Sequence, residues 1–145
     1  METEKSIQET LKTLFTTQKY AVLATQEENH PYLSLMAFIA TDNLKKLIFA
    51  TERDTRKYIN MINHPQTAAL IDNRSNQFSD TEQALAVTAL GVARECANSH
   101  YKHLFLKKHP QMKSFIKSPT CTLVEMRVSS YFLATGLFSF TEFQP

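Results

Sequence analysis

Glycine is scarce in this sequence. The chain of 145 residues contains only two glycines, whereas average usage of about 7% would supply about ten. Neither the dinucleotide fingerprint GxGxxG nor the phosphate loop GxxxxGK[ST] can therefore be written from this sequence. Any phosphate that the protein binds must be held in another way.

Three further absences narrow the class of protein. Cys96 and Cys121 form no CxxC pair, which excludes a zinc ribbon or a thioredoxin motif and favours reduced, packed thiols. Residues 1–7 are polar and acidic, whereas a secretion signal is basic and then apolar. No apolar run approaches the roughly 18 residues of a membrane span. We therefore expect a soluble cytoplasmic protein.

The sequence also lacks a strong excess of charge of one sign. Sixteen basic and fourteen acidic side chains give a formal net charge of +2, so we expect neither nucleic acid nor a membrane as a partner. Hydrophobic residues make up 43% of the chain and charged residues 21%, which is typical of a globular protein. The length indicates one domain over residues 1–145.

The first half of the chain reads as a helix followed by strands. Apolar residues recur at helical spacing from Thr3 to Phe15. Three strands follow, separated by polar turns at 26–31 and 41–43, and we expect them at Tyr20–Thr25, Tyr32–Ala40 and Leu47–Ala50. Connections this short leave no room for helical crossovers, so the pattern favours antiparallel pairing.

The second half mixes short helices with strands. A helix over 54–63, capped by Asp54, and a strand over 67–71 lead into a polar loop at 72–82. The remaining pattern predicts strands at 85–93, 122–128 and 131–140 and helices at 98–108 and 111–117. We therefore predict a mainly β (α+β) fold, an antiparallel six- to seven-stranded split β-barrel with short outer helices.

The predicted helix over 54–63 has two cations, Arg56 and Lys57, in its first turn. Cations at that end are disfavoured by the helix dipole unless an anion lies among them. The helix amides, the Arg56 guanidinium and the hydroxyl of Thr51 or Thr55 would together form a phosphate site without any glycine loop. The alternative is that both cations are merely solvated, and their spacing favours neither reading.

A longer set of motifs carries a family resemblance. In chain order they are a leading helix, Ala21-Val-Leu-Ala-Thr25, His30-Pro31-Tyr32, Ile48-Phe-Ala-Thr51, Thr55-Arg-Lys57, Asn60, Asn63-His-Pro65 and Ala68-Ala-Leu70. This order resembles the pyridoxamine 5'-phosphate oxidase-like, FMN-binding split-barrel family over residues 5 to 95. Residues 96 to 145 resemble the family only in their pattern of strands.

The resemblance implies FMN bound at a homodimer interface. Arg56, Lys57 and the hydroxyl of Thr51 would hold the phosphate. Backbone groups of the matching positions Ser34, Leu35 and Met36 would face the flavin ring. The partner chain would complete the pocket from the loop after the fourth strand, where Asn73 and Gln77 are the candidates.

The activity implied by the resemblance is a flavin-dependent oxidoreductase that passes electrons between a reduced nicotinamide or similar donor and a small organic substrate. The alternative is a non-enzymatic flavin- or haem-binding protein on the same fold. The sequence has no Ser-His-Asp order or carboxylate pair from which a catalytic residue could be named. This absence is consistent with a reaction whose chemistry is carried out by the cofactor.

Two departures from the family pattern argue against vitamin B6 as the substrate. True pyridoxamine phosphate oxidases carry an arginine-rich C-terminal segment, whereas this sequence has no arginine after Arg127. Ser34 also stands where those oxidases often have arginine. Because Arg56 and Lys57 would already hold the cofactor phosphate, no second cationic grip remains at the C-terminus for a phosphorylated substrate. We expect no oxidation of pyridoxamine or pyridoxine phosphate.

The remaining candidates have ordinary structural alternatives. His100 and His103 are spaced to share one helix face, but no third ligand is evident, so a solvated or packing role is favoured over metal or haem binding. Several aromatic residues near the C-terminus could line a flavin pocket or fill a dimer core, with core the favoured role for most, namely Phe132, Phe138, Phe140 and Phe143.

Overall fold

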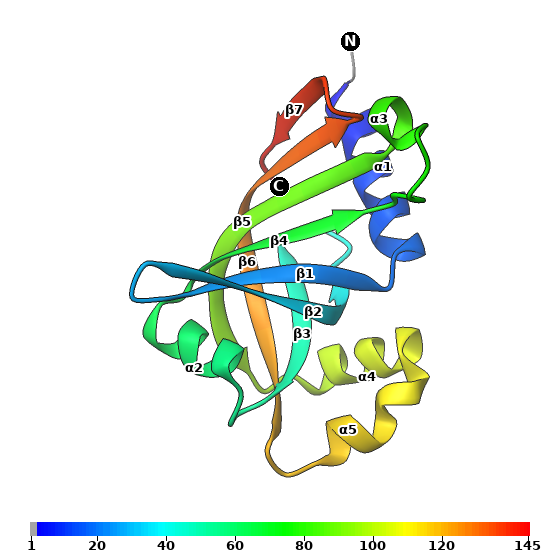
Figure 1. Ribbon diagram of the computed structural model, residues 1–145. Coiled ribbons are helices and arrows are strands. Elements are labelled where there is room, and N and C mark those ends of the chain that lie inside the picture. The colour runs from blue at the N-terminus through cyan, green and yellow to red at the C-terminus, as the bar shows by residue number, and fades with distance from the viewer. Residues whose placement is uncertain (1–2) are drawn as a thin grey trace.

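Seven antiparallel strands form one sheet, and six of them close into a barrel, in the computed structural model, which describes residues 3–145 (Figure 1). The order across the sheet is β3-β2-β1-β4-β5-β6-β7, and β3 also pairs with β6. The strands are β1 Tyr20–Glu27, β2 His30–Ala40, β3 Lys46–Glu52, β4 Gln66–Asp72, β5 Leu85–Cys96, β6 Cys121–Thr135 and β7 Ser139–Phe143. The predicted antiparallel split barrel is confirmed.

Short helices lie outside the barrel, as predicted. They are α1 Glu4–Thr17, α2 Arg56–Asn63, α3 Asp80–Gln83, α4 Ser99–Lys108, the 3₁₀ helix η1 Pro110–Met112 and α5 Lys113–Lys117. Figure 1 shows α2 at the end of the barrel opposite α1 and α3, with α4 and α5 along the side of β3. Within residues 3–145, no helix is long and apolar enough to cross a membrane.

The core fills the barrel and extends beneath α1. Alternate residues of β1 are buried, as expected for a strand with one face inside. From α1, Phe15 packs edge-on against Phe38 with ring centroids 6.1 Å apart, and also against Tyr131 at 5.5 Å. The buried Tyr131 hydroxyl donates to the carbonyl of Leu44 at 2.7 Å, so this polar atom is satisfied. A second cluster, around Ile48 and Phe105, lies under α4 and α5.

The first hairpin is tighter than predicted. The sequence suggested a six-residue turn, but only Glu28 and Asn29 separate β1 from β2. Both residues have positive φ, at 46° and 67°, which is the backbone of a two-residue hairpin turn whose twist matches the strands.

The predicted Asp54 cap is wrong, because Thr55 is the N-cap of α2. The short helix α3 begins within the loop predicted at 72–82 and ends at Gln83.

The prediction of two strands at 122–128 and 131–140 is wrong. One strand, β6, runs from Cys121 to Thr135, and Ser129 is the extra residue of a bulge within it. The turn comes later, at Gly136, where φ is +61°. A side chain there would meet the carbonyl oxygen of Thr81 at 2.4 Å, so glycine is required at this point.

A buried histidine follows α4. His109 is 0% exposed, its Nε2 lies 2.9 Å from the carbonyl oxygen of Phe38, and its ring packs on Phe105 at 4.9 Å. Its Nδ1 has no partner within residues 3–145. Burial, together with the nearby cations Lys108 and Lys19, lowers the pKa of His109 although the bond to Phe38 opposes this shift. The folded protein therefore holds this imidazole neutral.

We predict that the fold weakens as pH falls from 7.5 to 5 because of His109. The unfolded chain takes up a proton near pH 6.5, whereas the folded chain resists it, so protonation favours unfolding below that pH. His109→Gln lacks this titration, so the stability advantage of the parent protein over the variant should narrow in acid. Urea unfolding at both pH values measures this difference, with the exposed His103→Gln as control. A pH-independent difference would contradict the assignment.

Candidate functional site

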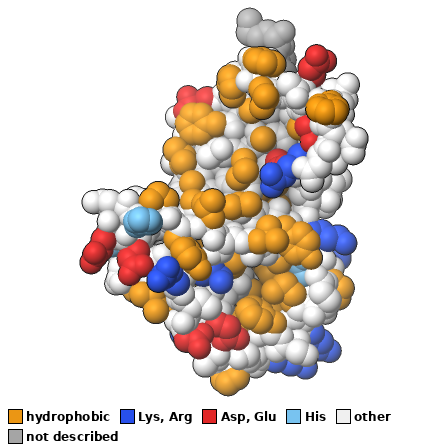
Figure 2. Space-filling model, viewed as in Figure 1, with side chains coloured by type: hydrophobic (Ala, Val, Ile, Leu, Met, Phe, Trp, Pro, Cys, Tyr) orange, Lys and Arg blue, Asp and Glu red, His pale blue; other side chains and the backbone are white. Residues whose placement is uncertain are grey.

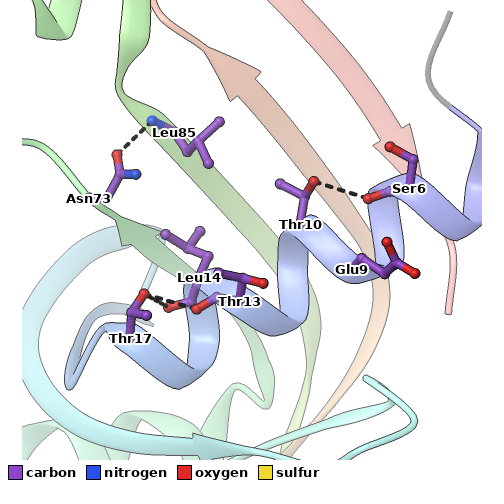
Figure 3. A pocket seen from close by; sticks show the side chains of 8 residues that line it. All are labelled: Ser6, Glu9, Thr10, Thr13, Leu14, Thr17, Asn73 and Leu85. Atoms are coloured by element: carbon purple, nitrogen blue, oxygen red, sulfur yellow. Dashed lines mark hydrogen bonds between the residues drawn. The ribbon is translucent and has the colours of Figure 1, made fainter.

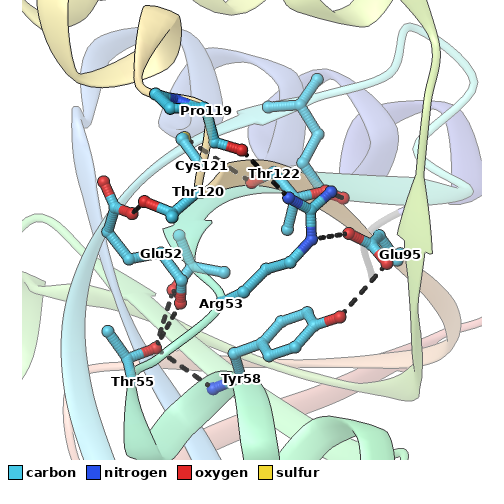
Figure 4. Close-up of polar contacts among 11 residues, drawn as sticks. Glu52, Arg53, Thr55, Tyr58, Glu95, Pro119, Thr120, Cys121 and Thr122 are labelled. Carbon is cyan, nitrogen blue, oxygen red and sulfur yellow. Dashed lines mark hydrogen bonds and ion pairs between the residues drawn. The ribbon is translucent and has the colours of Figure 1, made fainter.

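Threonine hydroxyls set the start of α2 at the end of β3 (Figure 4). The Thr55 hydroxyl donates to the carbonyl of Glu52 at 2.8 Å and accepts from the amide of Tyr58 at 3.4 Å. Thr51 is 1% exposed, and its hydroxyl lies 3.1 Å from that of Thr55. These bonds fix the direction in which the helix leaves the barrel.

Arg56 and Lys57 occupy the first turn of α2, where the sequence placed them, and no acidic residue shares that turn. The Arg56 guanidinium lies 5.2 Å from the centre of the Tyr32 ring and 3.7 Å from the carboxylate of Glu27. The Arg56 and Glu27 side chains are about 60% exposed, and such a pair contributes at most about 1 kcal/mol. Arg56 is therefore free to turn towards a ligand at the helix start.

A buried hydrogen bond ties α2 to the barrel wall. The amide of Asn60, which is 3% exposed, donates to the Thr25 hydroxyl on β1 at 3.1 Å. Asn60 belongs to the motif set that carried the family resemblance, and this bond gives it a structural role. Because both partners are buried, losing either would leave a polar group unsatisfied.

The barrel is split beside the start of α2. β2 pairs with β1 from His30 to Ala37 and with β3 only from Phe38 to Ala40. The edge of residues 34–36 that faces β3 therefore has no strand partner within residues 3–145. Leu35 points outward and is 72% exposed, whereas the Met36 side chain lies in the core. Unpaired backbone groups at such an edge can bond a ligand, and a flavin contact of residues 34–36 stays a prediction.

Asn73 and Gln77 lie at the other end of the barrel from α2. α2 ends shortly before β4 begins, whereas Asn73 comes directly after the last residue of β4. The length of this strand, roughly 20 Å, therefore separates Asn73 from α2. The Asn73 side chain accepts a bond from the amide of Leu85 at 2.8 Å and lines a cavity beside α1 of about 370 Å³ (Figure 3). One chain alone thus brings Asn73 and Gln77 nowhere near Arg56; a second chain would have to supply them.

The outer surface of the barrel carries an apolar face. Leu33 and Leu35 on β2, Leu90 and Val92 on β5, and Phe132 on β6 are between 40% and 72% exposed. Figure 2 shows hydrophobic side chains spread over these middle strands. The strand register makes the face continuous, because Leu33 pairs with Ala24, Ala24 with Ala68, and Ala68 with Leu90. A groove of about 440 Å³ runs along it.

The C-terminal aromatic residues divide between core and surface. Phe143 is buried, but Phe138 and Phe140 are 79% and 75% exposed and Phe132 belongs to the apolar face. Only Phe143 is packed within a single chain, so burial of the other three rings in a dimer core stays a prediction. Exposed phenylalanines in such number are unusual for a monomer.

A polar network that sequence analysis missed braces the start of α2 (Figure 4). Arg53 donates to Glu95 at 2.8 Å, and the Tyr58 hydroxyl donates to the same carboxylate at 3.2 Å. A hydrogen bond from Thr122, followed by those from Arg53 and Tyr58, lowers the pKa of Glu95. Arg53 and Glu95 are 42 residues apart in the chain, so no local pattern could have paired them.

The histidine and cysteine candidates lie in no cluster of possible metal ligands within residues 3–145. His100 and His103 are exposed on α4, and within residues 3–145 no three metal-ligating side chains cluster. Cys96 and Cys121 are free and half-buried. Burial raises the pKa of both thiols, which makes them poor nucleophiles at neutral pH.

The fold and site define the chain as a split-barrel domain with a basic helix start beside the opening in the barrel wall. Residues 7–130 match the family model described as pyridoxamine 5'-phosphate oxidase, and the chain belongs to that family. A search of curated proteins found no match.

Solved structures with the same fold share little sequence with this chain. General stress protein 26 from Bacillus anthracis is 20% identical, with a TM-score of 0.75 over 94% of this chain and 98% of that one. A Clostridium acetobutylicum protein related to general stress protein 26, of the pyridoxinephosphate oxidase family, is 16% identical, with a TM-score of 0.74 over 99% and 96%. A haem-binding protein from Mycobacterium smegmatis is 15% identical, with a TM-score of 0.84; the match covers 99% of this chain but only 59% of that protein.

We predict that Thr55→Ala destabilises the protein by about 1 kcal/mol, the usual cost of removing a helix N-cap. Thr55→Ser keeps the hydroxyl and should lose much less. Urea unfolding of both variants measures the difference. Equal stability of the alanine and serine variants would show that the hydroxyl does not hold the start of α2.

Proposed function

We propose that the protein binds FMN through the start of α2 and the unpaired stretch of β2. The observation that carries this proposal is the pair Arg56 and Lys57 in the first turn of a helix that opens beside backbone groups without a strand partner. A phosphate among these cations and the first α2 amides would turn an unfavourable arrangement of positive charge into a favourable one.

The local geometry fits a phosphate on several counts. Within residues 3–145, Lys57 forms no ion pair, and the single pair of Arg56 is long and exposed. The hydroxyl of Thr51, proposed as a third contact, lies at the end of β3 but is engaged with Thr55 and is 1% exposed, so this contact would require the Thr51 side chain to turn towards the phosphate. The ring would then lie along residues 34–36 beside the exposed Leu35, where backbone groups of β2 can bond its polar edge.

We propose a second copy of this chain as the occupant of the apolar face. The face spans β2, β5 and β6, which is more exposed apolar surface than a monomer of this size normally carries. A symmetric dimer would cover the face and could bring Asn73 and Gln77 of one chain towards the helix start of the other. This arrangement would account for their distance from Arg56 within one chain.

The activity that we propose is that of a flavin-dependent oxidoreductase acting on a small organic substrate. Bound FMN supplies hydride transfer between a reduced nicotinamide or similar donor and the substrate. Arg56 and Lys57 would anchor the cofactor. Backbone groups of β2 would orient the ring and stabilise negative charge at its edge, and Leu35 with the partner chain would exclude water. No side chain of this chain is assigned a proton-transfer role.

Haem is the second candidate ligand, and the domain would then serve as a binder without flavin chemistry. Its support is the similarity in fold to the haem-binding protein of Mycobacterium smegmatis. The absorption spectrum of the protein purified from cells distinguishes the two: flavin has one band in the near ultraviolet and one in the blue, whereas haem gives a single intense Soret band. A Soret band without flavin bands would overturn the FMN proposal.

We predict that Arg56→Ala/Lys57→Ala weakens FMN binding at least about 100-fold. Each charge-assisted contact to phosphate contributes roughly 1.5–3 kcal/mol, and 1.4 kcal/mol corresponds to a factor of ten. Quenching of FMN fluorescence on titration with the protein measures the affinity. Lys113→Ala/Lys117→Ala on α5 removes two cations away from the site and serves as the matched control. Unchanged affinity in a folded Arg56/Lys57 variant would refute the phosphate assignment.

We predict that the protein sediments as a dimer at micromolar concentration and that Leu35→Lys/Val92→Lys sediments as a monomer. Two cations placed in the apolar face would have to be buried without partners in the interface. Gln111→Lys/Ser114→Lys adds the same charge at exposed positions away from the face and should stay dimeric. A parent protein that is monomeric yet binds FMN tightly would exclude a pocket built from two chains.

A further inference from the structure

A cavity of about 830 Å³ lies between α1 and α4, over the turn that joins β2 to β3. It shares no lining residue with the start of α2 or with the apolar face. Its volume falls within the roughly 300–1,000 Å³ typical of small-molecule sites. The proposed FMN site leaves this cavity without a role.

The cavity has an apolar wall on each of its elements. Phe15 comes from α1, Ile39 from β2 and Leu104 from α4. Phe15 and Ile39 also belong to the hydrophobic clusters of the core, so they are held in place by packing. Such walls would accommodate an apolar group without rearrangement.

The charges around the cavity are mostly of one sign. The lining carries one carboxylate, from Asp42, against four lysines, namely Lys12, Lys46, Lys107 and Lys108. Within residues 3–145, only Lys46 among these four forms an ion pair, with Glu125 at 2.8 Å. Three cations around a partly apolar cavity therefore have no anionic partner, and this arrangement favours a ligand that brings one.

Lys108 is the most constrained of these cations. Its ammonium donates to the carbonyl of Phe15 at 2.7 Å and lies 4.0 Å from the centre of the Phe38 ring. Burial lowers its pKa to about 8. The bond to Phe15 places a cation at the C-terminal end of α1, which has no basic residue in its own last turn. That role explains Lys108 but not Lys12 or Lys107.

We propose that this cavity binds a small amphipathic carboxylate, an apolar chain that ends in one acid group. The chain would lie against Phe15, Ile39 and Leu104. The carboxylate would lie among Lys12, Lys107 and Lys108, where charge-assisted hydrogen bonds are stronger than neutral ones. The inference does not depend on FMN binding, because the two sites share no residue.

Calorimetric titration of the full chain with decanoate tests the proposal, with 1-decanol as the neutral counterpart and both probes kept below the concentrations at which they aggregate. Decanoate should bind saturably and at least tenfold more tightly than decanol. Lys12→Ala/Lys107→Ala removes two exposed lysines from the rim and should weaken decanoate binding about tenfold without changing that of decanol. Lys113→Ala/Lys117→Ala on α5 leaves the cavity intact and should bind decanoate as the parent protein does.

Three results would overturn the proposal: no saturable binding of decanoate, equal binding of decanoate and decanol, or the same loss in both lysine pairs. The last would show a general effect of net charge. Titration of FMN into the Lys12/Lys107 variant separates the two sites, since its FMN affinity should equal that of the parent protein.

Discussion

The pairing of β3 with β6 is the constraint on which the rest of this structure depends. It runs in register from Lys46 opposite Arg127 to Glu52 opposite Cys121, and it closes the sheet into a barrel with few free edges. β3 keeps β6 as a partner along its whole length but pairs with β2 over only three residue pairs. The split in the barrel wall, and the unpaired edge at residues 34–36, lie where β2 and β3 separate.

The same closure places both ends of the candidate site. Thr51 and Glu52 end β3 while still paired with β6, and the chain must then cross the end of the barrel to begin β4. α2 makes this crossing. Its Asn60 bonds Thr25 on β1, and its Tyr58 joins the network around Glu95 on β5. The first turn of α2 therefore lies beside the split in the barrel wall.

The two glycines stand where the backbone leaves room for nothing else. A side chain at Gly91 would meet the carbonyl oxygen of Arg127 at 2.2 Å, at the point where the β5–β6 register shifts. That bulge lets the long strand β6 bend, so that it pairs with β3 at one end and with β7 at the other. Gly136 makes the turn into β7. Both glycines of this sequence therefore serve the geometry of β6, and neither lies at the proposed phosphate site.

The acidic residues of this protein pair closely with some of its cations and weakly or not at all with others. Buried Glu125 pairs with Lys46 and also contacts Arg94, and Glu95 pairs with Arg53. These carboxylates hold strands and helices together. The start of α2, and three of the four lysines around the cavity between α1 and α4, have weak carboxylate partners or none within residues 3–145. Both places are accordingly where an external anion would gain most.

What the sequence determined by itself is the local structure and the chemistry that neighbouring residues share. The periodicity of α1, the antiparallel first hairpin and the paired cations of α2 depend on residues within a few positions of one another, so their spacing sufficed. The tertiary structure decided which distant segments meet. Ser129-Ser130 separates two apolar runs in the sequence, and only the pairing of β6 with β5 shows that one strand continues through it. The Arg53–Glu95 pair, the separation of Asn73 from Arg56 and the cavity between α1 and α4 also depend on how distant segments meet. Periodicity reports which side of a strand is buried, but not which strand lies beside it, because that choice is made by contacts between residues far apart in the chain.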